Sequence, residues 1–235
     1  MGKKLESNFK NMVLVLFTIT LISSAAVAYV NSLTAEPIEE AKQAKQVKAI
    51  REVIPGKFDN DPMAEAWAEK TPDGGILEFY PAKKEGQLLG TAVKTYTNNG
   101  FGGTVWLMVG FNPDGTIANY SVLDHKETPG LGSKMDSWFK PTQKEKSLIE
   151  RIFGFEVKSV EKQSSVIGKN PETQALAVSK DGGEVDAITA ATISSRAFLD
   201  AINRAANGLK GSRSRPWTWR PGPPFWGAPS AASPW

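Results

Sequence analysis

Residues 186–195, with the sequence DAITAATISS, are the most informative stretch of this chain. The pattern predicts a strand that leads into a helix, with Thr189 as the N-cap. The first amides of a helix have no partner within it and lie at the positive end of its dipole, so they form a site for an anion, above all a phosphate. Ala190 and Ala191 leave room for a bulky group, and Thr192 adds a hydroxyl. An ordinary capped helix start would contain the same residues.

Apolar residues continue at helical spacing after this stretch. The spacing predicts a helix from about residue 190 to 207, with Gly208 as its C-cap. The apolar face consists of Ile193, Ala197, Phe198, Ala201, Ile202 and Ala205.

Segments rich in β-branched and aromatic residues precede it, and they predict strands. The turn signal Asn112-Pro113-Asp114-Gly115 separates two of them and predicts an antiparallel hairpin. The expected strands are 76–80, 88–97, 104–111 and 116–123, with further short strands at 155–160 and 175–178 and a partly helical segment at 137–153. We therefore expect an α+β fold, with one mixed or antiparallel sheet flanked by helices.

The N-terminal region contains 19 uncharged residues, Met12 to Val30. At 1.5 Å per residue this run spans about 28 Å, close to the hydrocarbon thickness of a bilayer. Lys3, Lys4 and Lys10 precede it, which predicts a cytoplasmic N-terminus and an extracytoplasmic body. We expect an uncleaved transmembrane helix. A cleaved signal peptide ending at Ala26-Val27-Ala28 is the alternative.

The expected organisation has five parts. Residues 1–11 form a cytoplasmic N-terminus, 12–30 the transmembrane helix, 31–56 a helical linker, 57–210 the main domain and 211–235 a disordered tail. The linker contains apolar residues at helical spacing over 35–54 and stops at Pro55-Gly56. The tail contains six of the 15 prolines and four of the seven tryptophans, so a membrane-surface patch is its alternative interpretation.

Composition excludes several classes of protein. The chain has no cysteine and a single histidine, which rules out disulfide scaffolds, iron–sulfur ligation and multi-histidine metal sites. The tail's three arginines account for the net charge of +3, and the remaining chain has no basic excess to suggest nucleic-acid binding. We expect no metal site and no catalytic residue.

The pattern of residues 186–192 resembles a known family motif: Asp, two variable residues, Ser or Thr, Gly or Ala, then Ala-Thr. This motif marks FMN attachment in membrane flavoproteins of the Rnf and Na⁺-translocating NADH:quinone reductase complexes. The resemblance implies that a flavin transferase joins the FMN phosphate to Thr192, with FAD as donor. It also places Asp186, Thr189, Ala190 and Ala191 at the cofactor.

Two further elements support the resemblance, which covers residues 1–208 and extends to the G subunits of Rnf complexes. Residues 127–132 read ETPGLG, a signature of the same FMN-binding domain, and 99–103 look like its Gly-aromatic-Gly-Gly element. Pro129, Gly130 and Gly132 of the ETPGLG segment predict a tight turn whose backbone can approach a flat ring. The expected contacts are Glu127, Thr128, Gly130, Leu131, Gly132 and Lys134. His125 could tune a reduced flavin and Trp138 could reach it, but a solvated histidine and a core tryptophan are the alternatives.

The resemblance implies a single-pass flavoprotein of a bacterial or archaeal cell membrane, with covalent FMN. It would transfer electrons, without independent catalysis, in a complex that couples electron transfer between ferredoxin and NAD to the translocation of Na⁺ or H⁺. The other subunits, the membrane and the flavin transferase are its expected partners. A flavin-binding sensor and a non-redox extracytoplasmic binding module of the same fold are the alternative functions.

Overall fold

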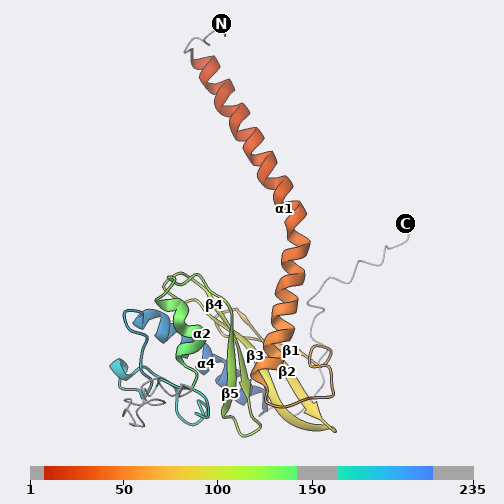
Figure 1. The fold of residues 1–235 in the computed structure, drawn as a ribbon, viewed down its shortest axis with the longest axis vertical. Helices are drawn as coiled ribbons and strands as arrows, with labels where there is room; N and C mark the ends of the chain where they lie inside the picture. Colours follow the sequence, from red (N-terminus) through yellow and green to blue (C-terminus); the bar gives the residue numbers. More distant parts are fainter. Residues whose placement is uncertain (1–7, 142–163, 214–235) are drawn as a thin grey trace, which may run out of the picture. The chain divides into compact units, whose positions relative to one another are not determined.

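The computed structural model describes residues 8–141 and 164–213, and the chain divides into two compact units between Lys45 and Gln46 (Figure 1). The division falls inside α1 (Phe9–Val53), the long first helix. The compact unit that contains the sheet thus begins at Gln46, upstream of residue 57.

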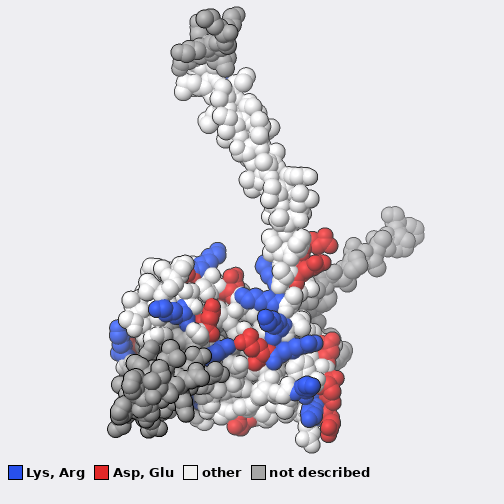
Figure 2. All heavy atoms as spheres, viewed as in Figure 1, with Lys and Arg blue, Asp and Glu red and all other residues white. Residues whose placement is uncertain are grey.

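The N-terminal unit contains the apolar part of α1. Within the described residues, α1 is the one helix long and apolar enough to cross a membrane, and that part is exposed and free of charged side chains (Figure 2). Its hydroxyls donate to carbonyls one turn back, as Thr18 Oγ1 does to Leu14 O at 2.8 Å and Thr34 Oγ1 to Val30 O at 3.0 Å. Polar groups satisfied within their own helix suit a hydrocarbon environment. The helix fits a single-pass membrane protein.

The second unit is built on a five-stranded sheet in the order β1-β2-β3-β4-β5. The strands are β1 (Trp67–Lys70), β2 (Ile76–Lys84), β3 (Gln87–Thr97), β4 (Val105–Phe111) and β5 (Ile117–Asp124), and all neighbours pair antiparallel. The four strands predicted between residues 76 and 123 are confirmed, and so is the hairpin turn, where Gly115 N–H donates to Asn112 O at 3.0 Å. The strand β1 was not predicted, because it has only four residues and two of them are charged.

Helices cover both faces of this sheet. Alternate strand residues, such as Phe79, Val93, Leu107 and Val109, share a core with α4 (Thr192–Arg213). On the other face, the last turns of α1 pack against the sheet in a second core made of Ala49, Ile50, Val53, Ile54, Tyr80, Ala82, Ala92 and Met108. This arrangement confirms the α+β class and anchors α4 along its length.

The helix predicted at 190–207 is present with different ends. It begins at Thr192, so Thr189 is not its N-cap, and it continues to Arg213. Gly208, predicted as the C-cap, lies inside the helix, where a Cβ would come within 2.6 Å of Leu77 Cδ1. Close packing against β2 therefore explains this glycine.

The strand predicted at 175–178 is not formed. Only an isolated bridge joins Val178 to Val185. The side chain of Asn203 on α4 instead binds both backbone groups of Leu176, each at 2.8 Å, and so takes the place of a strand partner. Of the predicted partly helical segment 137–153, residues 137 and 138 belong to the short helix α2 (Met135–Trp138), and residues 139–141 are not helical. Residues 142–153, the strand predicted at 155–160 and most of the tail lie outside the described residues.

Candidate functional site

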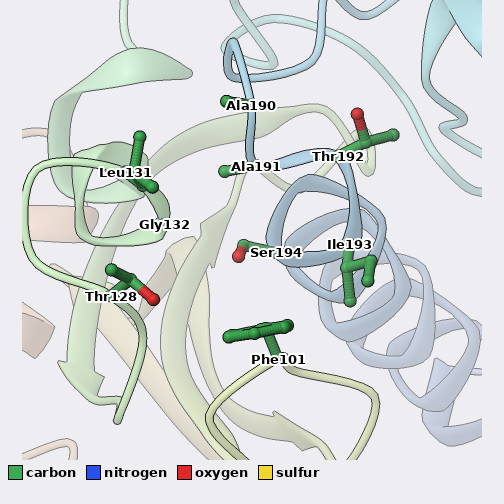
Figure 3. Close-up of a pocket in the computed structure, with 9 residues that line it drawn as sticks. All are labelled: Phe101, Thr128, Leu131, Gly132, Ala190, Ala191, Thr192, Ile193 and Ser194. Carbon is green, nitrogen blue, oxygen red and sulfur yellow. The ribbon is translucent and has the colours of Figure 1, made fainter.

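A hollow of about 390 Å³ lies where three segments meet (Figure 3). Phe101 comes from the loop after β3, Thr128 and Leu131 from the loop after β5, and Ala190 to Ser194 from the start of α4. These are the three elements that the sequence motifs indicated, and the fold brings them together. The volume lies within the range of about 300–1,000 Å³ found for small-molecule sites. The lining residues are Phe101, Thr128, Leu131, Gly132, Ala190, Ala191, Thr192, Ile193 and Ser194.

The turn before α4 is tight and contains a left-handed residue. Ala190 has φ of +62°, a conformation that costs an L-residue about 1–2 kcal/mol because of its Cβ and that glycine adopts without this cost. Ala191 N–H donates to Ile188 O at 3.0 Å, and Ala191 O accepts the first helical bond from Ser195 N–H, also at 3.0 Å. Ala191 is therefore the N-cap residue, and it has no side-chain oxygen.

Ser195 stabilises this turn in place of the expected cap. Its Oγ accepts from Ile188 N–H and donates to Ala191 O, each at 2.9 Å. Within the described residues, the amides of Thr192 and Ile193 have no hydrogen-bond acceptor. Two free first-turn amides therefore lie at the hollow, as an anion site requires.

Thr192 is half-buried, and a cation lies beside its hydroxyl. Lys180 Nζ donates to Thr192 Oγ1 at 3.4 Å. Lys180 belongs to the short 3₁₀ helix η2 (Ser179–Asp181), and its neighbour Asp181 accepts two hydrogen bonds from Arg196 on α4, at 2.6 and 2.7 Å. These bonds from Arg196 hold the pKa of Asp181 below its ordinary value. Lys180 was not predicted as a site residue, because no local pattern relates it to Thr192.

Glu127 is buried behind the hollow, at 5% exposure, and does not line it. Its Oε1 accepts from Gly102 N–H at 3.1 Å, its Oε2 accepts from the Ser194 hydroxyl, and its own N–H donates to His125 Nδ1 at 3.2 Å. A single carboxylate thus connects the loop after β3, the loop after β5 and the start of α4. Satisfied buried polar groups of this kind hold a site in one geometry. His125 therefore contacts this site indirectly, because its Nδ1 accepts from the backbone N–H of Glu127.

The loop that presents Phe101 is also fastened to α4. Asp200 Oδ2 accepts from Thr97 Oγ1 at 2.6 Å and from Asn99 Nδ2 at 3.2 Å. The ring of Phe101 is nevertheless 69% exposed, and Ile193 and Leu131 in the same hollow are 50% and 38% exposed. Large apolar side chains that gather in the open mark a binding surface. The hollow therefore combines an apolar, aromatic wall with the start of α4 at Thr192, whose unpaired amides are suited to an anion.

The other predicted site residues lie outside the lining. Gly130 shapes the loop: it has φ of +74°, and its N–H donates to Ser133 Oγ at 2.9 Å. The main-chain oxygen of Asp186 accepts from Trp138 Nε1 at 3.0 Å, which connects α2 to the segment before α4. Thr189 and Lys134 are exposed. Ile193 and Ser194, which do line the hollow, were not predicted; helical spacing alone assigns Ile193 to the apolar face of the helix.

Comparison with known proteins agrees with this geometry. Residues 100–207 match the model of the FMN-binding domain family, and residues 6–53 match that of the RnfG N-terminal region. The G subunit of the ion-translocating oxidoreductase complex of Vibrio cholerae serotype O1 (strain M66-2) is 31% identical over 196 residues, 82% of this chain and 86% of that protein. The corresponding G subunit of Stutzerimonas stutzeri is 34% identical over 176 residues, 74% of this chain and 69% of that protein.

Proposed function

Because the chain belongs to the family of Rnf complex G subunits, with an FMN-binding domain, we propose that it is a membrane-anchored electron carrier whose FMN is joined covalently to Thr192. As a member of that family it is an electron-transfer subunit of an ion-translocating oxidoreductase.

The observation that carries the proposal is the position of the Thr192 hydroxyl. Thr192 lines the hollow in the first turn of α4, where two amides have no acceptor among the described residues, and its hydroxyl accepts from Lys180 Nζ at 3.4 Å. Each of these groups favours a phosphate at this place. A phosphoester to Thr192 would use them all, whereas a plain helix start would need none of them.

The residues of the hollow fit the two ends of FMN. The phosphate would be held by Thr192, the amides of the first turn and Lys180, and the ring system by Phe101, Leu131 and Ile193. When bound, FMN supplies the capacity to take up and release electrons. Phe101 and its neighbours would orient the ring, and the exposure of this wall would leave the ring accessible to a redox partner.

The proposed setting follows from the membrane anchor. Lys3, Lys4 and Lys10, before the apolar run, favour an N-terminus in the cytoplasm, which would put the sheet domain on the extracytoplasmic side. Lost FMN could not be replaced readily there, so a covalent link has a purpose. A flavin transferase would install it, and the complex would couple electron transfer between ferredoxin and NAD to Na⁺ or H⁺ movement.

The test is attachment in the full-length chain produced together with a flavin transferase. We expect wild type to show a fluorescent band on a denaturing gel and the added mass of FMN less water. Thr192→Ala should show neither, with the fold retained, because Ser195 closes the turn. Thr189→Ala is the matched control: Thr189 is exposed and caps nothing, so attachment and stability should equal those of wild type. FMN still attached to Thr192→Ala would refute the proposal.

A further inference from the structure

We propose that Lys180 is the cation that binds the phosphate at Thr192 and promotes its attachment. The inference rests on the proposed function, and it assigns a role to a residue outside the family motif. Lys180 lies twelve positions before Thr192, on a separate turn, and its Nζ donates to Thr192 Oγ1 at 3.4 Å.

The turn that presents Lys180 is well anchored. Ser179 N–H donates to Val185 O at 2.9 Å, and Asp181 N–H donates to Val178 O at 2.8 Å. Arg196 lies one helical turn after Thr192 and holds Asp181 through two hydrogen bonds. The Asp181–Arg196 pair therefore fastens η2 to the first turns of α4 and keeps the lysine close to the threonine.

The charge of Lys180 is uncompensated within the part of the chain that the structure describes. No carboxylate of these residues lies within 4.0 Å of its Nζ, whereas Lys83, Lys94, Lys140 and Lys169 all form ion pairs. Among the described residues, the hydrogen-bond partner of Lys180 Nζ is the hydroxyl of Thr192. A cation held beside a hydroxyl and two free amides is suited to a phosphate oxygen.

The proposed step has a simple balance. The bond from Thr192 Oγ1 to the flavin-side phosphorus of FAD forms, the phosphoanhydride bond breaks, AMP leaves, and the hydroxyl proton passes to a base of the transferase. Because Lys180 donates to Oγ1, positive charge lies beside the atom that must lose this proton. The same cation would offset the charge on the phosphate oxygens as the new bond forms, and afterwards the single negative charge of the product diester.

The experiment compares four full-length chains, each produced with the transferase: wild type, Lys180→Gln, Lys180→Arg and Lys210→Gln. Lys210 is the matched control, because it is an exposed lysine on α4 that lies outside the lining of the hollow. Gel fluorescence and intact mass over time give the initial attachment rate. We expect Lys180→Gln to be slower by about tenfold, the loss of one charge-assisted hydrogen bond, and Lys180→Arg to recover most of the rate. Lys210→Gln should match wild type.

A second measurement does not depend on the rate. The phosphorus-31 NMR shift of the attached phosphate should differ between wild type and Lys180→Gln and stay unchanged in Lys210→Gln, with equal thermal melting by circular dichroism for all chains. A Lys180→Gln chain that loads at the wild-type rate with an unchanged shift would overturn the role of Lys180 alone, and so would a Lys180→Arg chain as slow as Lys180→Gln. A wild-type chain without covalent flavin would overturn the proposed function together with this inference.

Discussion

The carboxylate of Glu127 and the hydroxyl of Ser194 share a buried hydrogen bond, although 67 positions separate them in the chain. The same carboxylate accepts from Gly102 N–H. The bond joins the ETPGLG loop to the start of α4, and the Gly102 contact adds the Phe101 loop. Glu127 therefore positions the walls of the hollow from behind, while Thr128 and Gly132 of the same motif line it.

Glu127→Gln should loosen the Phe101 loop. A glutamine amide has one acceptor oxygen, so it cannot accept from both Gly102 N–H and Ser194 without rearrangement. We expect a loss of about 1–3 kcal/mol in the free energy of unfolding and a lower fluorescence anisotropy of attached flavin. Denaturant titration and anisotropy of the detergent-solubilised full-length protein measure the two effects. Unchanged anisotropy would show that the hydrogen bonds of Glu127 do not control the wall that we propose binds the flavin ring.

Gly132→Ala should disturb the hollow, whereas Gly130→Ala should not. A Cβ at Gly132 would lie 2.6 Å from Ser194 Oγ and 2.7 Å from Glu127 Oε2, so these two hydrogen-bonded side chains must shift. A Cβ at Gly130 meets nothing within 4 Å, and its φ of +74° only adds strain of about 1 kcal/mol. We expect a changed flavin spectrum and midpoint potential for Gly132→Ala alone. Equal changes in both variants would contradict this assignment.

Ala190→Gly should stabilise the protein, and Ala191→Gly should destabilise it. Glycine relieves the left-handed strain at Ala190, for a gain of up to about 1 kcal/mol. Ala191 is buried, and φ there is not positive, so glycine removes a packed methyl group and adds freedom to the unfolded chain. Thermal unfolding of the two variants should therefore move in opposite directions. A lower melting temperature for Ala190→Gly would argue against strain at this turn.

The Asp181–Arg196 pair should contribute stability that depends on pH. Hydrogen bonds from Arg196 hold the pKa of Asp181 below its ordinary value of 3.8, so the contribution is complete above that pH and is lost as the pH falls through the folded-state pKa. Wild type should thus exceed Asp181→Asn in stability at pH 7, and the difference should vanish in acid. Melting temperatures of both chains from pH 7 to 2.5 test this. A difference that does not decrease as the pH falls below 3.8 would assign it to another cause.

The orientation in the membrane can be tested with intact spheroplasts. External protease should digest the chain beyond residue 31, because the lysines before the apolar run favour a cytoplasmic N-terminus. Immunoblotting for tags at the two ends follows the digestion. Complete protection of the sheet domain, with an accessible N-terminus, would reverse the topology. A mature N-terminus at Tyr29 would instead demonstrate a cleaved signal peptide.

Patterns along the chain were sufficient for much of the fold. The uncharged run from Met12 to Val30 predicted an apolar helix, and segments rich in β-branched and aromatic residues predicted β2 to β5, because these features are local in the sequence. The prediction of a strand at 175–178 was wrong, because the side chain of Asn203 on a distant helix satisfies the backbone groups of Leu176. Local propensity cannot anticipate a partner supplied by packing.

Spacing along the chain alone predicted the helix start with its two alanines and Thr192, where we propose that a phosphate binds, since a turn and a helix face are encoded by neighbouring residues. Only the tertiary structure brought Glu127 to Ser194, Lys180 to Thr192 and Asp200 to the Phe101 loop. It also replaced the expected cap of Thr189 by the hydroxyl of Ser195 and put Gly208 inside α4 against Leu77. The long-range contacts require the packing of α4 and the loops on the sheet, because hydrogen bonds and close approaches between distant segments arise from the fold and leave no periodic trace in the sequence.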